Sequence, residues 1–227
     1  MKLPSTKSKP TSDIHEYTFL IYGAPKSGKT TFCSNFDKAL FIATEPGHKF
    51  QEIYKLDPQG WSDVREIAKQ LLQQRDKKQF KTIVFDTADN AYKMAETYIC
   101  KKEGITHMSD LSFGKGYGLV KNEFMGVVSA LTQAGYGIIF ISHAETRDLE
   151  EKSIKRSYTD TTLSGSARKV ISGLCDFIFY CYIDNEGNRK FATKGNPNLN
   201  AGDRSGKLPE IMDLDYKQLL KQLTGDK

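Results

Sequence analysis

The segment GAPKSGKT, residues 23–30, constrains the fold of this chain more than any other stretch of the sequence. Residues 17–22 before it are rich in apolar and β-forming side chains, and KTTF within and after it can open a helix. Glycine lets the backbone curl so that successive N–H groups point inward and form a concave site for an anion. A glycine turn that ends in Gly-Lys-Thr between a strand and a helix is therefore typical of a phosphate-binding loop.

This loop predicts which groups bind a nucleotide and its metal ion. The side chain of Lys29 can reach the β- and γ-phosphates, and the hydroxyl of Thr30 can ligate Mg²⁺. We therefore expect ATP and Mg²⁺ as ligands. The residues expected to bind the nucleotide along this loop are Gly23, Ala24, Pro25, Lys26, Ser27, Gly28, Lys29, Thr30 and Thr31.

A carboxylate that could complete the magnesium site ends the segment TIVFD, residues 82–86. Its continuous apolar run is typical of a strand that is buried on both faces of a parallel sheet. Such strands often end in aspartate, so the pattern is weak alone and gains its meaning from the phosphate-binding loop. We expect Asp86 to contribute to nucleotide binding and, together with Thr30, to hold Mg²⁺.

Two further side chains follow strand-like segments and are candidates for hydrolysis. Glu45 ends ALFIATE, and because Thr87 rather than a second acid follows Asp86, Glu45 is the favoured group to polarise water. His143 follows GIIFIS and could sense the γ-phosphate, so we count Lys29, Glu45 and His143 as the catalytic candidates. The alternatives are a surface turn residue before Pro46 and a hydrogen-bonded histidine at the end of a strand.

Alternating strand-like and helix-like segments predict an α/β fold with a mainly parallel central sheet flanked by helices. Strands are expected over 17–23, 38–47, 81–90, 136–148, 171–184 and 189–197, the last two forming a C-terminal β-hairpin. Helices are expected over 28–38, 61–78, 90–104, 117–135 and 215–225. Residues 1–13 are rich in Lys, Ser, Thr and Pro and are expected to be a disordered arm, which leaves 14–227 as one domain.

Composition limits the partners of the protein. The net charge of +5 is mild, so it permits binding to nucleic acid without requiring it. The four cysteines show no C-x-x-C spacing, which favours buried reduced thiols over a zinc site or disulfides. No apolar run approaches the ~20 residues needed to span a bilayer, and the polar start has no signal-like apolar segment. We expect a cytoplasmic protein that does not enter membranes.

The ordered set of motifs resembles the RecA-like core of recombinase ATPases. After the loop come FIATE, IVFDT and IIFISHAE, matching that family's glutamate, aspartate and γ-phosphate sensor positions. The segments SFGKGYG, SHAETR and GNPNLNAGDRSGKLPE resemble, more narrowly, phage-encoded AAA-type ATP-binding proteins, which include the Sak-type recombination ATPases. The resemblance covers about residues 17–215.

This resemblance implies a RecA-like P-loop NTPase that hydrolyses ATP while acting on single-stranded DNA in phage recombination or replication. It also implies a homo-oligomer, either ring or filament, a possible single-strand-binding protein partner and residence in the host cytoplasm. His143 stands where the recombinases have glutamine, and no separate DNA-binding domain is evident. Annealing or loading therefore agrees better with the sequence than full strand exchange.

In that family two loops near the central axis bind DNA, and both have counterparts here. Aromatic and basic side chains among glycines suit base stacking with backbone contact, and a basic stretch without acids suits phosphate contact. The candidates in the two segments are Phe113, Lys115 and Tyr117 and then Lys152, Lys155 and Arg156. The alternatives are aromatic side chains that pack inward at the start of a helix and a solvated mobile loop.

A basic tail offers candidates for a cation that acts on the nucleotide of a neighbouring subunit. Residues 189–207 carry five basic residues against one acid. A cation supplied in trans can stabilise charge that develops in the transition state. Lys194 and Arg204 are the candidates, and a surface hairpin with solvated charges is the alternative.

Two other functions use the same phosphate-binding loop. A small-molecule phosphotransferase would need a lid with arginines, and ETRDLEEKSIKR could supply one. A nucleotide-gated adaptor or loader would bind ATP without DNA-dependent turnover.

Overall fold

The computed structural model describes residues 3, 5–7, 11–77, 79–151 and 154–225, with the side chains of 149–155 excepted. Residues 1–2, 4 and 8–10 of the N-terminal arm expected to be disordered lie outside the described residues, and so does Lys152. The first element is a short 3₁₀ turn, η1, at Ile14–Glu16, whose N-terminus is capped by the side chain of Asp13.

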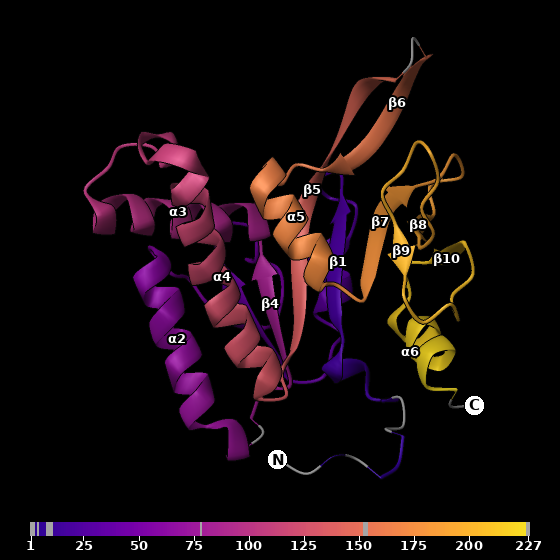
Figure 1. The fold of residues 1–227 in the computed structure, drawn as a ribbon. Coiled ribbons are helices and arrows are strands. Elements are labelled where there is room, and N and C mark those ends of the chain that lie inside the picture. Colours follow the sequence, from indigo (N-terminus) through magenta and orange to yellow (C-terminus); the bar gives the residue numbers. More distant parts are fainter. Residues whose placement is uncertain (1–2, 4, 8–10, 78, 152–153, 226–227) are drawn as a thin grey trace.

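A twisted, mainly parallel sheet forms the centre of the molecule (Figure 1). Its main path runs β10-β8-β7-β1-β5-β4-β2-β3, with β6 paired to β5 and β9 paired to β7. The strands are β1 (Thr18–Gly23), β2 (Ala39–Ala43), β3 (Tyr54–Leu56), β4 (Thr82–Asp86), β5 (Gly137–Glu151), β6 (Ile154–Thr161), β7 (Phe177–Ile183), β8 (Arg189–Ala192), β9 (Gly202–Asp203) and β10 (Ile211–Asp213). β1, β2, β3, β4, β5 and β7 pair in parallel, whereas β8, β9 and β10 pair antiparallel at one side.

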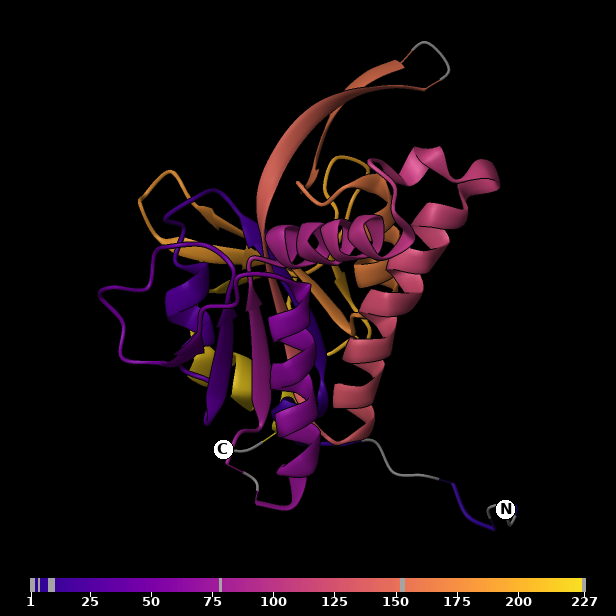
Figure 2. The same cartoon turned by 90° about the vertical axis from the view of Figure 1, so that its left-hand side faces the viewer.

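Helices cover both faces of this sheet. The helices are α1 (Lys29–Cys33), α2 (Trp61–Gln73), α3 (Ala88–Glu103), α4 (Lys115–Gln133), α5 (Gly165–Leu174) and α6 (Tyr216–Thr224). Short 3₁₀ turns follow α2 and precede α4, at Arg75–Lys77, Met108–Asp110 and Ser112–Gly114. Side chains of α2, α3, α4 and α5 belong to one buried apolar cluster, and those of α1 and α6 belong to another (Figures 1 and 2).

The central strands supply side chains to both clusters. In β1, Leu20 joins the cluster under α2 to α5, whereas Phe19 and Ile21 join the cluster under α1 and α6. Successive strand residues point to opposite faces, so a strand covered on both sides needs an unbroken apolar run. This explains why the segments expected to be buried strands show no polar alternation, and the predicted α/β class with flanking helices is confirmed.

The first helix is much shorter than the expected span of 28–38. It ends at Cys33, and the side chains of Ser34 and Asn35 both donate to the carbonyl oxygen of Thr31, at 2.8 Å each. In a continuing helix that carbonyl would accept from the backbone N–H of Asn35. Local side-chain bonds of this kind compete with the helix and end it.

The polar segment after residue 148, expected to be a DNA-binding loop, instead belongs to an antiparallel hairpin. β5 continues without interruption through Ala144 to Glu151 and pairs with β6. The hairpin extends beyond the rest of the molecule (Figures 1 and 2). Because no core covers this extension, its sequence needs no apolar face and shows no two-residue period.

Two smaller elements also differ from expectation. β3 escaped prediction because all three of its residues are exposed at the sheet edge, where burial imposes no pattern. The strand expected from residue 171 begins only at Phe177, since Ile171–Leu174 end helix α5.

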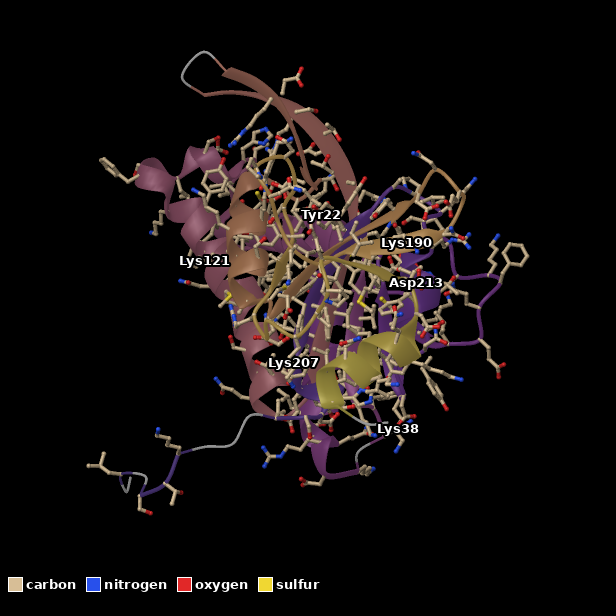
Figure 3. All side chains as sticks on the ribbon, turned by 90° about the vertical axis from the view of Figure 1, so that its right-hand side faces the viewer. Tyr22, Lys38, Lys121, Lys190, Lys207 and Asp213 are labelled. Carbon is tan, nitrogen blue, oxygen red and sulfur yellow. The ribbon has the colours of Figure 1, made fainter. Side chains whose placement is uncertain are left out.

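The C-terminal part forms the predicted hairpin of β7 and β8, extended by β10. Lys190 of β8 and Asp213 of β10 form an ion pair at 2.5 Å beside α6 (Figure 3). Helix α6 ends at Gly225 in the left-handed conformation, close to the expected end. The four cysteines are free thiols, and none of the described helices is long and apolar enough to cross a membrane.

Candidate active site

The loop between β1 and α1 adopts the compact curl that its glycines predict. Gly28 has a φ of 104°, and Lys26 also has a positive φ of 66°. A side chain at Gly23 would overlap the carbonyl oxygen of Cys181 on the neighbouring strand β7. The backbone of the loop is therefore held tightly against the sheet, and neither Gly23 nor Gly28 has free space for a side chain.

Lys29 lies at the start of α1 with only 6% of its surface exposed. Its Nζ donates to the carbonyl oxygens of Gly23 and Ala24, each at 2.9 Å. Burial lowers the pKa of this amine, with Cys181, Asp86 and Glu45 acting in the opposite direction. An anion brought into the loop would restore favourable interactions for the buried ammonium.

The hydroxyl of Thr30 donates to Oδ2 of Asp86 at 2.8 Å, across α1 and β4. Nε2 of His48 lies 3.0 Å from the same oxygen, and Asp86 is 3% exposed. Hydroxyl and carboxylate oxygens are the ligands that Mg²⁺ prefers, usually together with waters and substrate phosphates. Among the described residues no three His, Cys, Asp or Glu side chains group as a metal site.

Glu45 and His143 approach each other above the carboxyl end of β2 and the position in β5 where its parallel pairing with β1 ends. Nε2 of His143 lies 3.4 Å from Oε1 of Glu45, and both side chains are about one-third exposed. Thr44 holds this end of the sheet together, because its hydroxyl donates to the carbonyl of Thr87 at 2.8 Å and accepts from the N–H of Thr87 at 2.9 Å. Glu45 is thereby fixed beside Asp86.

These groups line one cavity of about 650 Å³ at the carboxyl ends of the parallel strands. Of the residues expected to act here, the cavity is lined by Pro25, Lys26, Gly28, Lys29, Thr30, Thr31, Glu45, Asp86 and His143. Ser27 is 2% exposed, and its hydroxyl has no hydrogen-bond partner among the described residues. A buried hydroxyl without a partner in a curled, glycine-containing loop fits a phosphate ligand.

The start of α4 and the described part of the β5–β6 hairpin, which carry predicted DNA-contacting residues, lie at the same end of the molecule as the phosphate-binding loop (Figures 1 and 2). None of the described candidates lines the cavity. Phe113 has a positive φ of 55° and is fully exposed, and Tyr117 is 46% exposed. Lys115, expected in a loop, instead begins α4, and Tyr117, where the helix was expected to begin, lies in its first turn. Arg156 is half-buried on β6, while the side chain of Lys155 and all of Lys152 lie outside the described residues.

The structure does not bring the two expected trans-acting cations to the cavity of their own chain. Arg204 pairs with Asp176 at 2.8 Å, and Asp176 also accepts from the N–H of Thr18 at the start of β1. That is the end of β1 opposite to the phosphate-binding loop. Lys194 is exposed beyond the end of β8.

Two residues that line the cavity or contact one of its residues were not predicted from the sequence. His48 contacts Asp86 from the loop after β2, and Arg189 lines the cavity from the start of β8. Neither belongs to a motif, because each reaches the site through the pairing of distant segments. For His48 the only sequence signal was its position three residues after Glu45.

Comparison with known proteins identifies the family. The sequence model of a family described as an AAA domain matches residues 15–205. A search among curated proteins finds no match. The mainly parallel sheet with its flanking helices has the RecA-like P-loop NTPase fold. Because the match spans most of the chain and includes the phosphate-binding loop, Asp86 and His143, the protein belongs to the AAA domain family of P-loop ATPases.

Proposed function

We propose that the protein hydrolyses ATP to ADP and phosphate and uses the reaction to control its affinity for single-stranded DNA. The observation that carries the hydrolytic part is the single cavity in which Lys29, the Thr30–Asp86 pair and the Glu45–His143 pair meet. This is the combination that in-line attack of water on a γ-phosphate needs: a phosphate cation, a metal site and a group that orients water.

The residues of the phosphate-binding loop hold the substrate. Lys29 exchanges its bonds to the carbonyls of Gly23 and Ala24 for bonds to β- and γ-phosphate oxygens. Thr30 and Asp86 would hold Mg²⁺, which when bound neutralises charge on the phosphate oxygens as a Lewis acid. Their existing hydrogen bond keeps both oxygens near the place where the ion is needed.

Glu45 and His143 respond to the γ-phosphate. Without it, the 3.4 Å contact between the two side chains engages the carboxylate of Glu45. A γ-phosphate oxygen attracts the imidazole of His143, which releases Glu45 to accept a proton from the attacking water. The same exchange makes the position of His143 depend on whether ATP or ADP is bound.

The route from nucleotide to DNA runs along β5. His143 lies on the same strand that continues into the projecting hairpin, so a shift at the cavity acts directly on the hairpin. Exposed Phe113 and Tyr117 at the start of α4 could stack with bases, with Lys115 near the DNA backbone. The basic residues Lys152, Lys155 and Arg156 could bind phosphates. The resemblance of motifs further supports a role in phage recombination or replication, as a homo-oligomer that anneals or loads with a single-strand-binding protein.

The test is steady-state ATP hydrolysis with and without single-stranded DNA, for the wild type, Lys29→Ala and Glu45→Gln. We expect turnover that rises with DNA and is lost in both variants, while Glu45→Gln still binds ATP. A hydrolysis rate that does not change with DNA would contradict the DNA part of the proposal. It would favour a phosphotransferase that acts on a small-molecule acceptor. Binding of ATP without turnover in the wild type would instead favour a nucleotide-gated adaptor.

The DNA contact has its own matched pair of variants. Phe113→Ala removes a fully exposed aromatic ring at the start of α4, and Tyr54→Ala removes one that is 63% exposed on the edge strand β3. Base stacking is worth about 1–3 kcal/mol per ring. We expect Phe113→Ala alone to weaken binding to single strands by about tenfold or more, with unchanged basal hydrolysis. Equal effects of the two variants would count against a specific stacking role.

A further inference from the structure

Arg189 is the first residue of β8, and the strand register places it at the level of the phosphate-binding loop. Gly23, the last residue of β1, pairs with Cys181, whereas Arg189 pairs with Ile183, two residues farther along β7. Since β7 runs parallel to β1, Arg189 stands just past the carboxyl end of β1, where the loop begins. Lys194 lies beyond the other end of β8.

The side chain of Arg189 lies against the loop. A Cβ atom built on Gly28 would stand 2.9 Å from Cδ of Arg189 and 3.3 Å from its Nε. Leu214 flanks the same glycine, and its backbone N–H donates to the carbonyl oxygen of Arg189 at 3.0 Å. The aliphatic stem of Arg189 therefore packs over Gly28, and Arg189 lines the cavity together with Lys29 and Thr30.

The charge of Arg189 has no acidic partner in any ion pair recorded between described residues. The adjacent Lys190 points to the other face of the strand and pairs with Asp213 at 2.5 Å (Figure 3). Arg189 is exposed at the mouth of the cavity, and the cavity carries two other cations, Lys26 and Lys29. Glu45 and Asp86 are the acidic residues of the same lining, so the three cations outnumber the acids, which favours an anionic ligand.

We propose that Arg189 is a phosphate-binding residue acting within its own subunit, contacting the phosphate chain of the nucleotide from the β8 side. This inference rests on the proposed function, because it assigns a further contact to the same nucleotide. A guanidinium offers several N–H donors in a planar fork that matches phosphate oxygens. Because its side chain packs over Gly28 of the phosphate-binding loop, Arg189 is placed to contact the phosphates rather than the base.

The test compares ATP with inorganic tripolyphosphate, a ligand that has the phosphates without the base. Arg189→Met keeps an unbranched stem to pack on Gly28 and removes the charge, and Arg189→Lys keeps a charge without the fork. Lys190→Ala is the matched control, since it removes the neighbouring cation from the opposite face. Displacement of a fluorescent ATP analogue from the full-length protein, in the presence of Mg²⁺, measures both affinities, and thermal melting checks that each variant is folded.

We expect Arg189→Met to weaken ATP and tripolyphosphate by a similar factor of about ten, the scale of one charge-assisted hydrogen bond, and Arg189→Lys to fall between it and the wild type. Lys190→Ala should leave both affinities unchanged. The inference is overturned if Arg189→Met has no effect, if it weakens ATP alone, or if Lys190→Ala weakens binding equally. It also falls if the wild type binds ATP but not tripolyphosphate. A wild type that binds no ATP contradicts the proposed function itself, so the two failures are distinct.

Discussion

Two glycines of the phosphate-binding loop exclude a side chain for different reasons. Gly28 combines a φ of 104° with close neighbours, because a Cβ atom there would lie 2.8 Å from Leu214 and 2.9 Å from Arg189. Gly23 has an ordinary strand conformation, but the backbone carbonyl of Cys181 occupies the space that a side chain would need. The flexible side chains of Leu214 and Arg189 could move aside for a Cβ atom at Gly28. The backbone of Cys181 cannot move away from Gly23 without disturbing β7.

Substitution of Gly23 by alanine should therefore lower the stability of the protein even without a ligand. We expect a loss of about 1–3 kcal/mol in the free energy of unfolding, the usual cost of forcing an extra methyl group into a packed site. Gly126→Ala is the matched control, since the same methyl group enters open space in the middle of α4 and should add about 0.5–1 kcal/mol. Urea denaturation of both variants measures this, and a Gly23→Ala protein as stable as wild type would contradict the close packing.

At the scale of elements, one buried carboxylate attaches the projecting hairpin to the body. Asp160 of β6 is 3% exposed and accepts from Arg147 of β5, Arg168 of α5 and Asn200 of the C-terminal segment, each at 2.7 Å. The backbone N–H of Thr161 adds a fourth bond at 2.8 Å. Because both arginines pair with Asp160, less free positive charge remains at the base of the hairpin.

Asp160→Asn should loosen this attachment. An amide cannot neutralise two guanidinium groups, although partial exposure of Arg147 and Arg168 lets water reduce the cost to about 1–3 kcal/mol of unfolding free energy. Because β5 links His143 to the hairpin, we also expect a weaker effect of DNA on hydrolysis, with basal turnover retained. Asp148→Asn, an exposed carboxylate on the same hairpin, should change stability by less than about 0.5 kcal/mol. Identical behaviour of the two variants would show that Asp160 has no special role.

At the scale of the whole molecule, two apolar clusters share one sheet. Trp61, the single tryptophan, stacks on Phe124 in the cluster under α2 to α5. Leu219 of α6 is fully buried in the cluster on the opposite face. Adjacent residues of β1, β4 and β5 belong to different clusters, so neither face can lose its packing without disturbing strands that the other requires.

Fluorescence of Trp61 should therefore report damage on the far face. We expect Leu219→Ala to lower the free energy of unfolding by about 2–5 kcal/mol and to move the urea midpoint of the Trp61 signal with an unchanged slope. Lys217→Ala, an exposed change in the same helix, should leave the midpoint in place. If the urea midpoint of the Trp61 signal is the same in Leu219→Ala as in the wild type, the two faces unfold separately.

The sequence alone determined the phosphate-binding loop and the side chains at the ends of the central strands. The loop depends on a short local order of residues, so its chemistry can be read without tertiary information. Glu45, Asp86 and His143 could be grouped because the carboxyl ends of parallel strands meet at one edge of a sheet. Apolar runs likewise predicted the buried strands, since burial on both faces leaves a signal in every residue.

The tertiary structure was needed to identify the residues that join the site from distant segments and the strands that are exposed to solvent. His48 reaches Asp86, and Arg189 reaches the cavity, through pairing across the sheet, and no local pattern marks either residue. The hairpin of β5 and β6 and the edge strand β3 carry no apolar period, because neither rests on a core. Local rules identify what a residue can do, whereas the register of the strands determines which distant residues share a site.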